Sequence, residues 1–593
     1  MSSGQFDFAL AIGGAAGQGI ATPGNILART FTRRGLWLNA YNAFQSIVRG
    51  GHIFLTMRIS DQKIYTHGDR LDLLLCLNQD TMDRHLCLMG AGGRVIFNSD
   101  KVTPGELPEG VQLCPMPIKE LSNKSRNKVI QNTIALGAIN SLLGIEFDVL
   151  ENALKLQFSR KGDAVVEENA SAARAGYDYA KENFESYPEP LASGTKPLAL
   201  WTGNDALAMG GAAAGVKFYT AYPMSPSTGV LHWMAQNARE LGIMVRQGED
   251  EIAVANMAIG AAHVGARTMS ATSGGGFALM TEAVGSAAMM EIPVVFINVM
   301  RAGPSTGVPT KTEQGDLWQV LGASQGDFER LIVAPTDALD AFKCVPELFN
   351  LCDQKQCPGI IITDLLISEG TFSADPDDID LQPEIDRGEL INGGKPNGEY
   401  LRYEITDSGV SPRALPGLEG HMHVVATDEH DQDGVLISDE YTNPHKRRRM
   451  VEKRARKIAN VVEQIAPPEL EGPSNADVTL IGWGSTYGVI KEALELLNEQ
   501  GVSTNHLPIR WIVPFHAQTV IDIVNNAKRT IIVENSYSGQ FHRYMRSETG
   551  LKIDGHIRKY DGEPFMPHHI VDAVLEQVAG KTNHSVPYQE IMV

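Results

Sequence analysis

Three segments in the middle of the chain carry residue types that can bind a cofactor ring and an anion. The acidic triplet Glu249–Glu251 opens a helix rich in alanine and glycine, and the glycine loop T-S-G-G-G follows at Thr272–Gly276. Arg301 comes next, in a run of small hydroxylated residues that extends to Thr310. A carboxylate can hydrogen-bond to a heterocycle, and arginine can hold a carboxylate through two parallel N–H groups. Together the segments predict one half of an active site.

Each segment also has a purely structural explanation. Acids are favoured in the first turn of a helix by its dipole, which would account for the triplet. The turn Y-P-M-S-P-S-T at Tyr222–Thr228 presents the hydroxyls of Ser225, Ser227 and Thr228. These hydroxyls either cap the helix that begins near Thr228 or donate to a substrate carboxylate. Arg301 can likewise belong to a structural ion pair, so both interpretations stay open at this point.

The elements around these segments predict a parallel, doubly wound sheet. A glycine-rich helix is expected at Asp205–Ala214, and buried strands with helices between them at Lys217–Ala221, Arg267–Ala271, Val294–Val299, Leu331–Ala334 and Gly359–Thr363. The turn at Tyr222, the glycine loop and Arg301 all follow such strands. Ligands bind at the carboxyl ends of the strands in this class of sheet.

The N-terminal region predicts another α/β domain, reaching to about residue 185. A strand at Phe6–Ile12 leads into the glycine turn Gly13–Gly19 and a helix at Ile20–Arg34, with further strands at Leu71–Leu77 and Arg94–Asn98. The glycine spacing is not the dinucleotide fingerprint G-x-G-x-x-G. A tight structural turn and a phosphate-binding loop are equally compatible with it.

The rest of the chain divides into a hinge, a connector and a third α/β unit. Tyr187–Pro197 is expected to be the hinge. Residues 366–470 are acidic, proline-rich and irregular, and they end in the basic run His445–Lys457, for which we expect a solvated connector helix. The third unit is expected to contain a strand at Val478–Gly482, a helix at Tyr487–Gln500 and a strand at Thr530–Glu534.

Composition excludes several classes of protein. With 593 residues the chain is too long for one hydrophobic core. A formal charge of −20 argues against general nucleic-acid binding. The N-terminus lacks the features of a signal peptide and no apolar run is long enough for a membrane span, so the cytoplasm is the expected location. The six cysteines form no C-x-x-C pair, which predicts reduced thiols and neither a metal site nor an iron–sulfur cluster.

The motifs, taken in order, resemble one family. Y-P-M-S-P-S-T, E-D-E-I-A, T-S-G-G-G-F-A-L-M and R-A-G-P-S-T-G-V-P-T-K-T-E-Q-G-D-L are similar to the alpha subunit of 2-oxoacid:ferredoxin oxidoreductases, which are thiamine diphosphate enzymes. I-G-G-A-A-G-Q-G-I (Ile12–Ile20) and S-I-V-R-G-G-H (Ser46–His52) resemble the gamma subunit, here fused ahead of alpha. G-V-S-P-R-A-L-P-G (Gly409–Gly417) and V-E-N-S-Y-S-G-Q (Val533–Gln540) fit the same family.

The resemblance implies an α/β fold with three doubly wound domains. Residues 1–187 would be a gamma-type, Rossmann-like domain, and residues 198–365 a pyrimidine-binding thiamine diphosphate domain. Residues 366–470 would be an irregular connector with a basic helix, and residues 475–593 a domain like the transketolase C-terminal domain.

The resemblance also implies roles for individual residues. Glu251 would be the catalytic carboxyl that hydrogen-bonds N1′ of the aminopyrimidine ring, so that the ring's 4′-nitrogen can take a proton. Arg301, Thr310 and Ser225 would bind the substrate carboxylate, although the motif usually has threonine where this chain has Ser225. The remaining cofactor contacts would come from Tyr222, Pro223, Ser273, Gly274 and Gly275.

The implied reaction is the oxidative decarboxylation of a 2-oxoacid, with 2-oxoglutarate as first choice, to an acyl-CoA and CO₂ with electrons passed to ferredoxin. The chain has no G-D-G motif and no cluster cysteines, so Mg²⁺ with the diphosphate site and a [4Fe–4S] cluster would come from a beta subunit, in a dimer of heterodimers. The gamma-type domain would be the contact for coenzyme A. Pyruvate, branched-chain or aryl 2-oxoacids, a self-sufficient thiamine transferase and a non-catalytic assembly or regulatory subunit remain alternatives.

Overall fold

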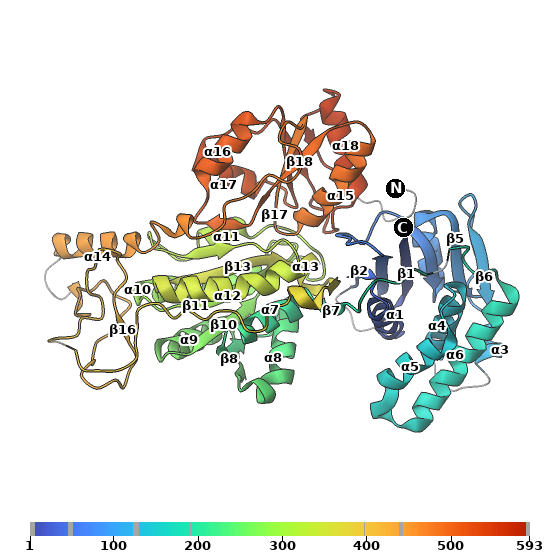
Figure 1. Ribbon diagram of the computed structural model, residues 1–593, viewed down its shortest axis with the longest axis horizontal. Helices are drawn as coiled ribbons and strands as arrows, with labels where there is room; N and C mark the ends of the chain where they lie inside the picture. Colours follow the sequence, from blue (N-terminus) through green and yellow to red (C-terminus); the bar gives the residue numbers. More distant parts are fainter. Residues whose placement is uncertain are drawn as a thin grey trace.

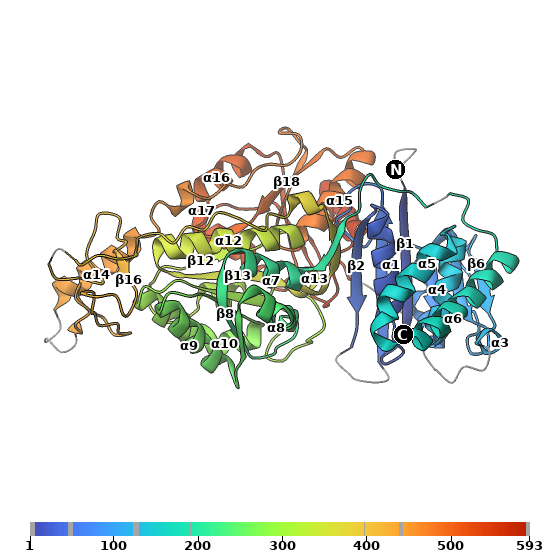
Figure 2. The same cartoon turned by 60° about the horizontal axis from the view of Figure 1, so that its bottom comes forward.

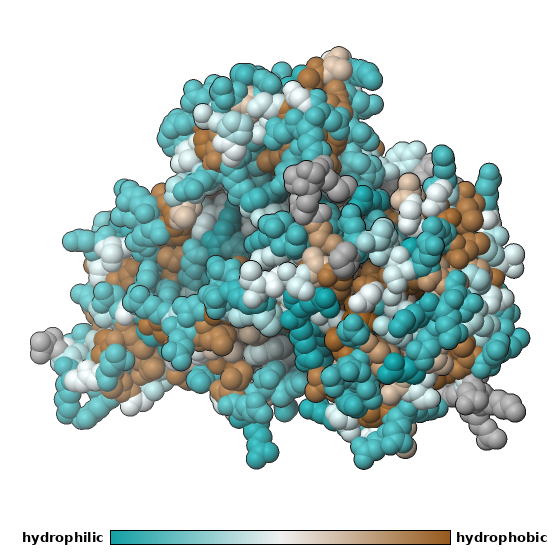
Figure 3. Space-filling view, turned by 45° about the vertical axis from the view of Figure 1, so that its right-hand side comes forward, coloured by the Kyte–Doolittle hydropathy of each residue, from teal (hydrophilic) through white to brown (hydrophobic). Residues whose placement is uncertain are grey.

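The computed structural model describes residues 6–45, 51–122, 130–189, 191–396, 398–437 and 443–588. The described residues form three α/β units and a connector that projects from one end of the molecule (Figure 1). The predicted α/β fold is confirmed. Most of the motif Ser46–His52, at residues 46–50, lies outside the described residues. The face drawn in Figure 3 is largely hydrophilic, with apolar residues in scattered patches.

The N-terminal unit is built on a mixed sheet with the strand order β6-β5-β4-β1-β3-β2-β14-β7. Strand β1 is parallel to β4 but antiparallel to β3, so this sheet is not the purely parallel kind. Helices α1, α4, α5 and α6 pack together against it (Figure 2). The elements are β1 Asp7–Ala15, α1 Ala21–Arg33, β2 Trp37–Ala43, β3 His52–Ser60, β4 Leu71–Cys76, α2 Gln79–His85, β5 Met89–Asn98, β6 Gln112–Met116, α3 Ile118–Leu121, α4 Ile130–Leu142, α5 Phe147–Phe158 and α6 Asp163–Asn183.

The middle unit has the strand order β19-β12-β13-β11-β10-β8-β9. All of its neighbouring strands are parallel except the pair β12 and β19, because β19 enters from the C-terminal unit. Helices α7, α8 and α12 pack on one face, and α9 and α10 on the other. The elements are β7 Ala199–Thr202, α7 Gly203–Ala213, β8 Val216–Ala221, α8 Thr228–Leu241, β9 Met244–Gln247, α9 Glu251–His263, β10 Arg267–Thr272, α10 Gly274–Met289, β11 Val294–Met300, α11 Leu317–Leu321, β12 Leu331–Val333, α12 Ala338–Lys355, β13 Pro358–Asp364 and α13 Leu365–Glu369.

The connector carries β14 Thr371–Ala374, β15 Leu390–Ile391, β16 Arg413–Ala414 and α14 Pro444–Arg456. The expectation of a solvated helix is wrong for the end of α14. Lys453 is fully buried and donates to both carboxylate oxygens of Glu291 at 2.7 Å, and the buried Lys457 lies 3.3 Å from the same carboxylate. Helical spacing with mixed charges is compatible with a solvated helix. It is equally compatible with a helix whose cations form buried ion pairs with an acid far away in sequence.

The C-terminal unit has the strand order β18-β17-β20-β21-β22. Its elements are β17 Val478–Trp483, α15 Thr486–Glu499, β18 Thr504–Ile509, β19 Trp511–Val513, α16 Ala517–Asn526, β20 Thr530–Glu534, α17 Gln540–Thr549, β21 Gly555–Arg558, α18 Pro567–Val578 and β22 His584–Ser585. Trp483 and Phe541 of this unit share one apolar core with Phe296 and Ile332 of the middle unit. The two units therefore pack as one body.

Candidate active site

Four neighbouring strands bring the predicted site segments to one edge of the middle sheet. In the order β11-β10-β8-β9, the strands are followed by Arg301, by the glycine loop, by the turn at Tyr222 and by the acidic triplet. Because adjacent parallel strands end at the same edge, segments up to 79 residues apart, from Tyr222 to Arg301, become neighbours. The sheet thus assembles the site.

At the start of α9, the acidic residues have separate roles. Asp250 is the N-cap, and its carboxylate accepts from the Ala253 N–H at 2.7 Å. Glu251 is 3% exposed, and its Oε1 has no hydrogen-bond partner among the described residues. A side chain at Gly276 would come within 2.6 Å of that oxygen, so the carboxyl lies directly against the first turn of α10. The capping explanation therefore accounts for Asp250, but it does not give Glu251 Oε1 a partner among the described residues.

The turn after β8 does not cap α8 through its side chains. Ser227 precedes the helix, but its hydroxyl donates to the Met224 carbonyl instead, at 2.7 Å. Tyr222 and Ser225 are exposed and Pro223 is partly buried. The Ser225 carbonyl accepts from Arg301 Nη1 at 2.7 Å, so this turn and Arg301 are in direct contact.

The glycine loop begins α10 and lies between two carboxyl groups. Ser273 precedes the helix, and its hydroxyl is buried without a partner in the described part of the chain. Side chains added at Gly274 and Gly276 would collide with Asp316 and with Glu251, respectively. Only glycine allows both carboxyl groups to approach this helix start so closely.

Arg301 and Thr310 stand at the two ends of one loop. The Ala302 N–H donates to the Lys311 carbonyl at 3.0 Å, which closes the loop next to both residues. Burial lowers the pKa of Arg301, and the charge of Asp316 opposes that change. Thr310 is buried at 4% exposure.

A cleft of about 700 Å³ opens beside the glycine loop. Gly274, Gly275 and Arg301 line it from the middle unit, and Ser536–Ser538 and Gln540 line it from the C-terminal unit. Glu251, Ser225 and Thr310 are not part of its wall. The structure thus brings Arg301 and the glycine loop to the cleft, while Glu251 lies behind the first turn of α10.

Two cleft residues, Glu313 and Asp316, were not predicted. Burial raises the pKa of Glu313 to about 7, and the neighbouring Asp316 adds to that change. Burial also raises the pKa of Asp316, which accepts a hydrogen bond from Asn298 Nδ2 at 3.1 Å. Both belong to the segment K-T-E-Q-G-D-L, which is part of the family motif. Two acids shortly after an arginine were the sequence signal that could have identified them.

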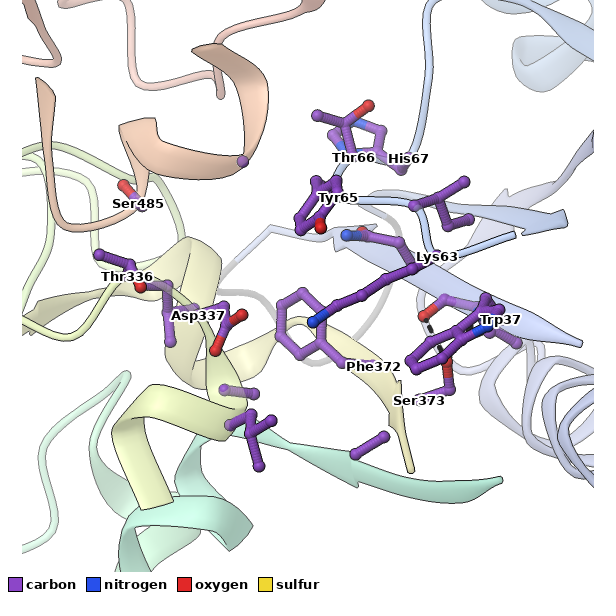
Figure 4. A pocket seen from close by; sticks show the side chains of 18 of the residues that line it. Trp37, Lys63, Tyr65, Thr66, His67, Thr336, Asp337, Phe372, Ser373 and Ser485 are labelled. Atoms are coloured by element: carbon purple, nitrogen blue, oxygen red, sulfur yellow. Dashed lines mark hydrogen bonds between the residues drawn. The ribbon is translucent and has the colours of Figure 1, made fainter. Parts of the chain in front are cut away.

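In the described structure, two further pockets lie where the N-terminal unit meets the other two units. One is lined by Trp37, Tyr65, Asp337, Phe372 and Ser485, and in Figure 4 the Lys63 side chain extends across it toward Asp337. The other, of about 470 Å³, is lined by Tyr41 and Arg84 of the N-terminal unit, Lys311 of the middle unit, and Glu563 and His568 of the C-terminal unit.

Within the described residues, no group of three or more histidine, cysteine or acidic side chains is arranged to hold a metal ion. Cys87 is exposed and the other five cysteines are buried and unpaired. The same part of the chain contains no helix with the length and apolar character needed to cross a bilayer.

Comparison with known families identifies the class of each unit. Residues 9–179 match the family of pyruvate ferredoxin/flavodoxin oxidoreductases, and residues 209–451 match the thiamine diphosphate-binding domain of pyruvate flavodoxin/ferredoxin oxidoreductases. Residues 470–586 match the transketolase C-terminal domain. The three units are therefore those of a thiamine-dependent oxidoreductase.

Relatives cover nearly the whole chain. It is 30% identical over 632 residues to 2-oxoacid:ferredoxin oxidoreductase 2, subunit alpha, of Aeropyrum pernix, covering 96% of this chain and 97% of the relative. It is 29% identical to 2-oxoglutarate oxidoreductase subunit KorA of Mycobacterium tuberculosis, covering 88% and 84% of the two chains. The solved structure of 2-oxoglutarate:ferredoxin oxidoreductase from Magnetococcus marinus, with 2-oxoglutarate, coenzyme A and succinyl-CoA bound, matches with a TM-score of 0.89 and 30% identity, covering 96% and 99%.

The chain belongs to the alpha subunits of the 2-oxoacid:ferredoxin oxidoreductases. The family resemblance of the motifs and the prediction of an oxidoreductase are confirmed.

Proposed function

We propose that this chain forms the pyrimidine-and-substrate half of an enzyme that oxidatively decarboxylates 2-oxoglutarate to an acyl-CoA and CO₂, with electrons passed to ferredoxin. The observation that supports it most is the buried Glu251 carboxyl, one oxygen of which has no partner in the described chain. An unsatisfied buried carboxyl oxygen is costly unless a ligand completes it. The choice of 2-oxoglutarate rests on the relatives from Mycobacterium tuberculosis and Magnetococcus marinus.

The residues present fit thiamine diphosphate. Glu251 offers an oxygen to a ring nitrogen, and the adjacent Ser273 hydroxyl is also free to pair in the described structure. Tyr222, Pro223, Gly274 and Gly275 would complete the contacts to the cofactor. When bound, the cofactor supplies the carbon nucleophile and the electron sink that decarboxylation requires. Glu251 would hold a proton against the ring nitrogen and so set the ring's tautomer.

Arg301 would hold the substrate carboxylate in the cleft. Ser225, which contacts Arg301 through its carbonyl, and Thr310, at the far end of the same loop, are the other proposed substrate contacts, although neither lines the cleft. Arg301 lines the cleft, and its Nη1 is already oriented by the Ser225 carbonyl. Its Nε is buried without a partner in the residues that the structure describes. A guanidinium that is held on one side and still has an unpaired N–H is suited to carboxylate binding.

A partner subunit would supply Mg²⁺ with the diphosphate site and a [4Fe–4S] cluster. The two helices beside Glu251 carry exposed apolar side chains: Ile252 and Met257 on α9, Val264 at its C-cap and Leu279 on α10 are each at least 41% exposed. Large exposed apolar side chains on two packed helices are typical of a binding face. We infer that the beta subunit covers this face, in a dimer of heterodimers located in the cytoplasm.

We assign coenzyme A contact to the N-terminal unit. The pocket of about 470 Å³ lies between this unit and Lys311, which follows Thr310 directly. Arg70 and Arg84 on its wall suit phosphate groups.

The proposed domain division is residues 1–187, 198–365, 366–470 and 475–593. Strands β7 and β14 extend the first sheet across these boundaries.

The test is Glu251→Gln in the complex reconstituted with its beta subunit. The amide cannot share a carboxyl proton with the ring, so 2-oxoglutarate-dependent viologen reduction should fall by about 100-fold or more. Glu249→Gln, two residues away at the exposed helix start, is the matched control and should keep wild-type turnover.

Three outcomes would contradict parts of this assignment. Wild-type turnover in an assembled Glu251→Gln complex would favour the non-catalytic subunit. Activity of the isolated chain would favour a self-sufficient thiamine enzyme. Turnover of pyruvate, branched-chain or aryl 2-oxoacids in preference to 2-oxoglutarate would contradict the choice of substrate but not the proposed reaction.

A further inference from the structure

Two carboxyl groups accompany Arg301 in the cleft. Asp316 is held by Asn298 Nδ2 at 3.1 Å and lies against Gly274, and its charge acts on both Arg301 and Glu313. Glu313 comes three residues earlier and lines the same wall. The charge of Asp316 therefore influences the protonation of both Arg301 and Glu313.

When Glu313 and Asp316 are both ionised, the charges in the cleft do not favour the binding of an anion. Among the described residues that line it, Arg301 is the one cation and Glu313 and Asp316 are the two acids, and the other side chains from both units are uncharged. Lys311, two residues before Glu313, is paired with Glu563 and faces another pocket. With both acids ionised, a carboxylate would enter a cleft that already has excess negative charge.

We propose that Asp316 and Glu313 form an acid pair that takes up a proton when a carboxylate binds to Arg301, so that the cleft admits the substrate anion without an excess of charge. The proposal rests on the assignment of Arg301 to the substrate carboxylate. It adds two positioning residues that act through Arg301, and it makes anion affinity depend on pH.

The sign of the dependence follows from burial and repulsion. Burial already holds the pKa of Glu313 at about 7, with Asp316 adding to the shift. A new negative charge at Arg301 disfavours the ionised pair further and raises its pKa again. Binding is therefore tightest below the pKa of the pair and weakens as pH rises through it. Glu313 is the member that takes up the proton, because burial and the neighbouring Asp316 both raise its pKa.

The experiment measures the binding of oxamate, an unreactive 2-oxoacid analogue, to the reconstituted complex by calorimetry. For the wild type, affinity should fall about tenfold between about pH 6 and about pH 8.5, with proton uptake detected as a dependence of the heat on the buffer. Glu313→Gln keeps this side chain neutral, so its affinity should stay near the low-pH value and proton uptake should disappear. Glu313→Asp should restore both.

The outcomes separate this inference from the proposed function. Equal pH slopes for the wild type and Glu313→Gln, or no proton uptake by the wild type, overturn the acid pair. Oxamate binding that survives Arg301→Ala at every pH overturns the assignment of Arg301 instead. Glu240→Gln, exposed near the end of α8 on the other face of the sheet, is the control and should behave as wild type. A thermal melt of each complex shows that a flat profile does not come from misfolding.

Discussion

At the scale of single residues, the site depends on a close approach between Glu251 and the first turn of α10. The Glu251 carboxyl lies where a side chain at Gly276 would be, and the Thr272 hydroxyl lies there as well. Because Glu251 Oε1 has no hydrogen-bond partner among the described residues, packing against this turn positions it. A glycine at position 276 is therefore a requirement of the site and not only of the turn.

Gly276→Ala should displace Glu251. The added methyl would come within 2.1 Å of Thr272 Oγ1 and 2.6 Å of Glu251 Oε1, so one of them must move. Overpacking of this kind costs about 1–3 kcal/mol of stability, and a shift of about 1 Å in a catalytic group costs about 100-fold in rate. Dye reduction and calorimetry of the complex measure the two effects. Gly105→Ala in the N-terminal unit, where the described chain leaves open space around the new methyl, is the thermal control. Full activity with Gly276→Ala would show that Glu251 tolerates displacement.

The sequence predicted the site residues that lie in motifs, because strand ends and glycine loops are local signals. The turn at Tyr222, Ser273 and Arg301 fall where the expected strands end. Glu313 and Asp316 were missed because their role depends on tertiary neighbours. Asp316 matters through its approach to Gly274, 42 residues earlier, and through Arg301. The roles of these residues in binding the cofactor and the substrate stay predictions.

At the scale of elements, α14 shows what charge patterning leaves undecided. The basic run is helical as expected, yet Lys453 and Lys457 are buried against Glu291, which is 162 residues from Lys453. Burial alone would raise the pKa of Glu291, but Lys457, Lys453 and Arg402 outweigh it and lower the pKa to about 2. This acid anchors the connector to the middle unit.

Lys453→Met should destabilise the protein by about 3 kcal/mol, because it leaves the buried Glu291 with one cation fewer. Arg448→Met is the matched control, since the exposed pair of Arg448 with Glu452 on the same helix should contribute no measurable stability. Urea unfolding measures both. Because the pKa of Glu291 is depressed, its contribution is complete above about pH 4.5 and is lost as pH falls toward 2. Equal stability of the two variants would mean that the pair offsets only its own desolvation.

At the scale of the whole molecule, strands from one part of the chain join the sheet of another unit, so the units are not independent domains. Strand β19 of the C-terminal unit pairs with β12 of the middle sheet, and β14 and β7 extend the N-terminal sheet. Local sequence patterns give the strands, but they do not show which sheet an edge strand joins. For this reason the hinge and the domain limits expected from composition do not coincide with the limits of the sheets.

One glutamate connects the N-terminal unit to the C-terminal unit. Glu492 on α15 accepts from the Tyr65 and Thr66 N–H groups at 2.7 and 2.8 Å, from the Thr66 hydroxyl, and from Arg58 Nη1 at 2.7 Å. Its side chain is 12% exposed, and Arg58 is 16% exposed. Removal of one member of such a partly buried, fully hydrogen-bonded pair costs about 2–5 kcal/mol, because the partner charge and the backbone donors lose their acceptor.

Glu492→Ala should therefore release the N-terminal unit before the remaining body unfolds. We expect two thermal transitions where the wild type shows one, and faster cleavage of the segment between residues 187 and 197 by a nonspecific protease. Glu576→Ala, exposed on α18 of the same unit, should leave melting and cleavage unchanged. The rate of CO₂ release should change less than the Michaelis constant for coenzyme A, because Glu251 and Arg301 lie in the body that stays folded, whereas the proposed coenzyme A pocket needs both units. A single unshifted transition in Glu492→Ala would show that the strands shared between the units are sufficient to hold them together.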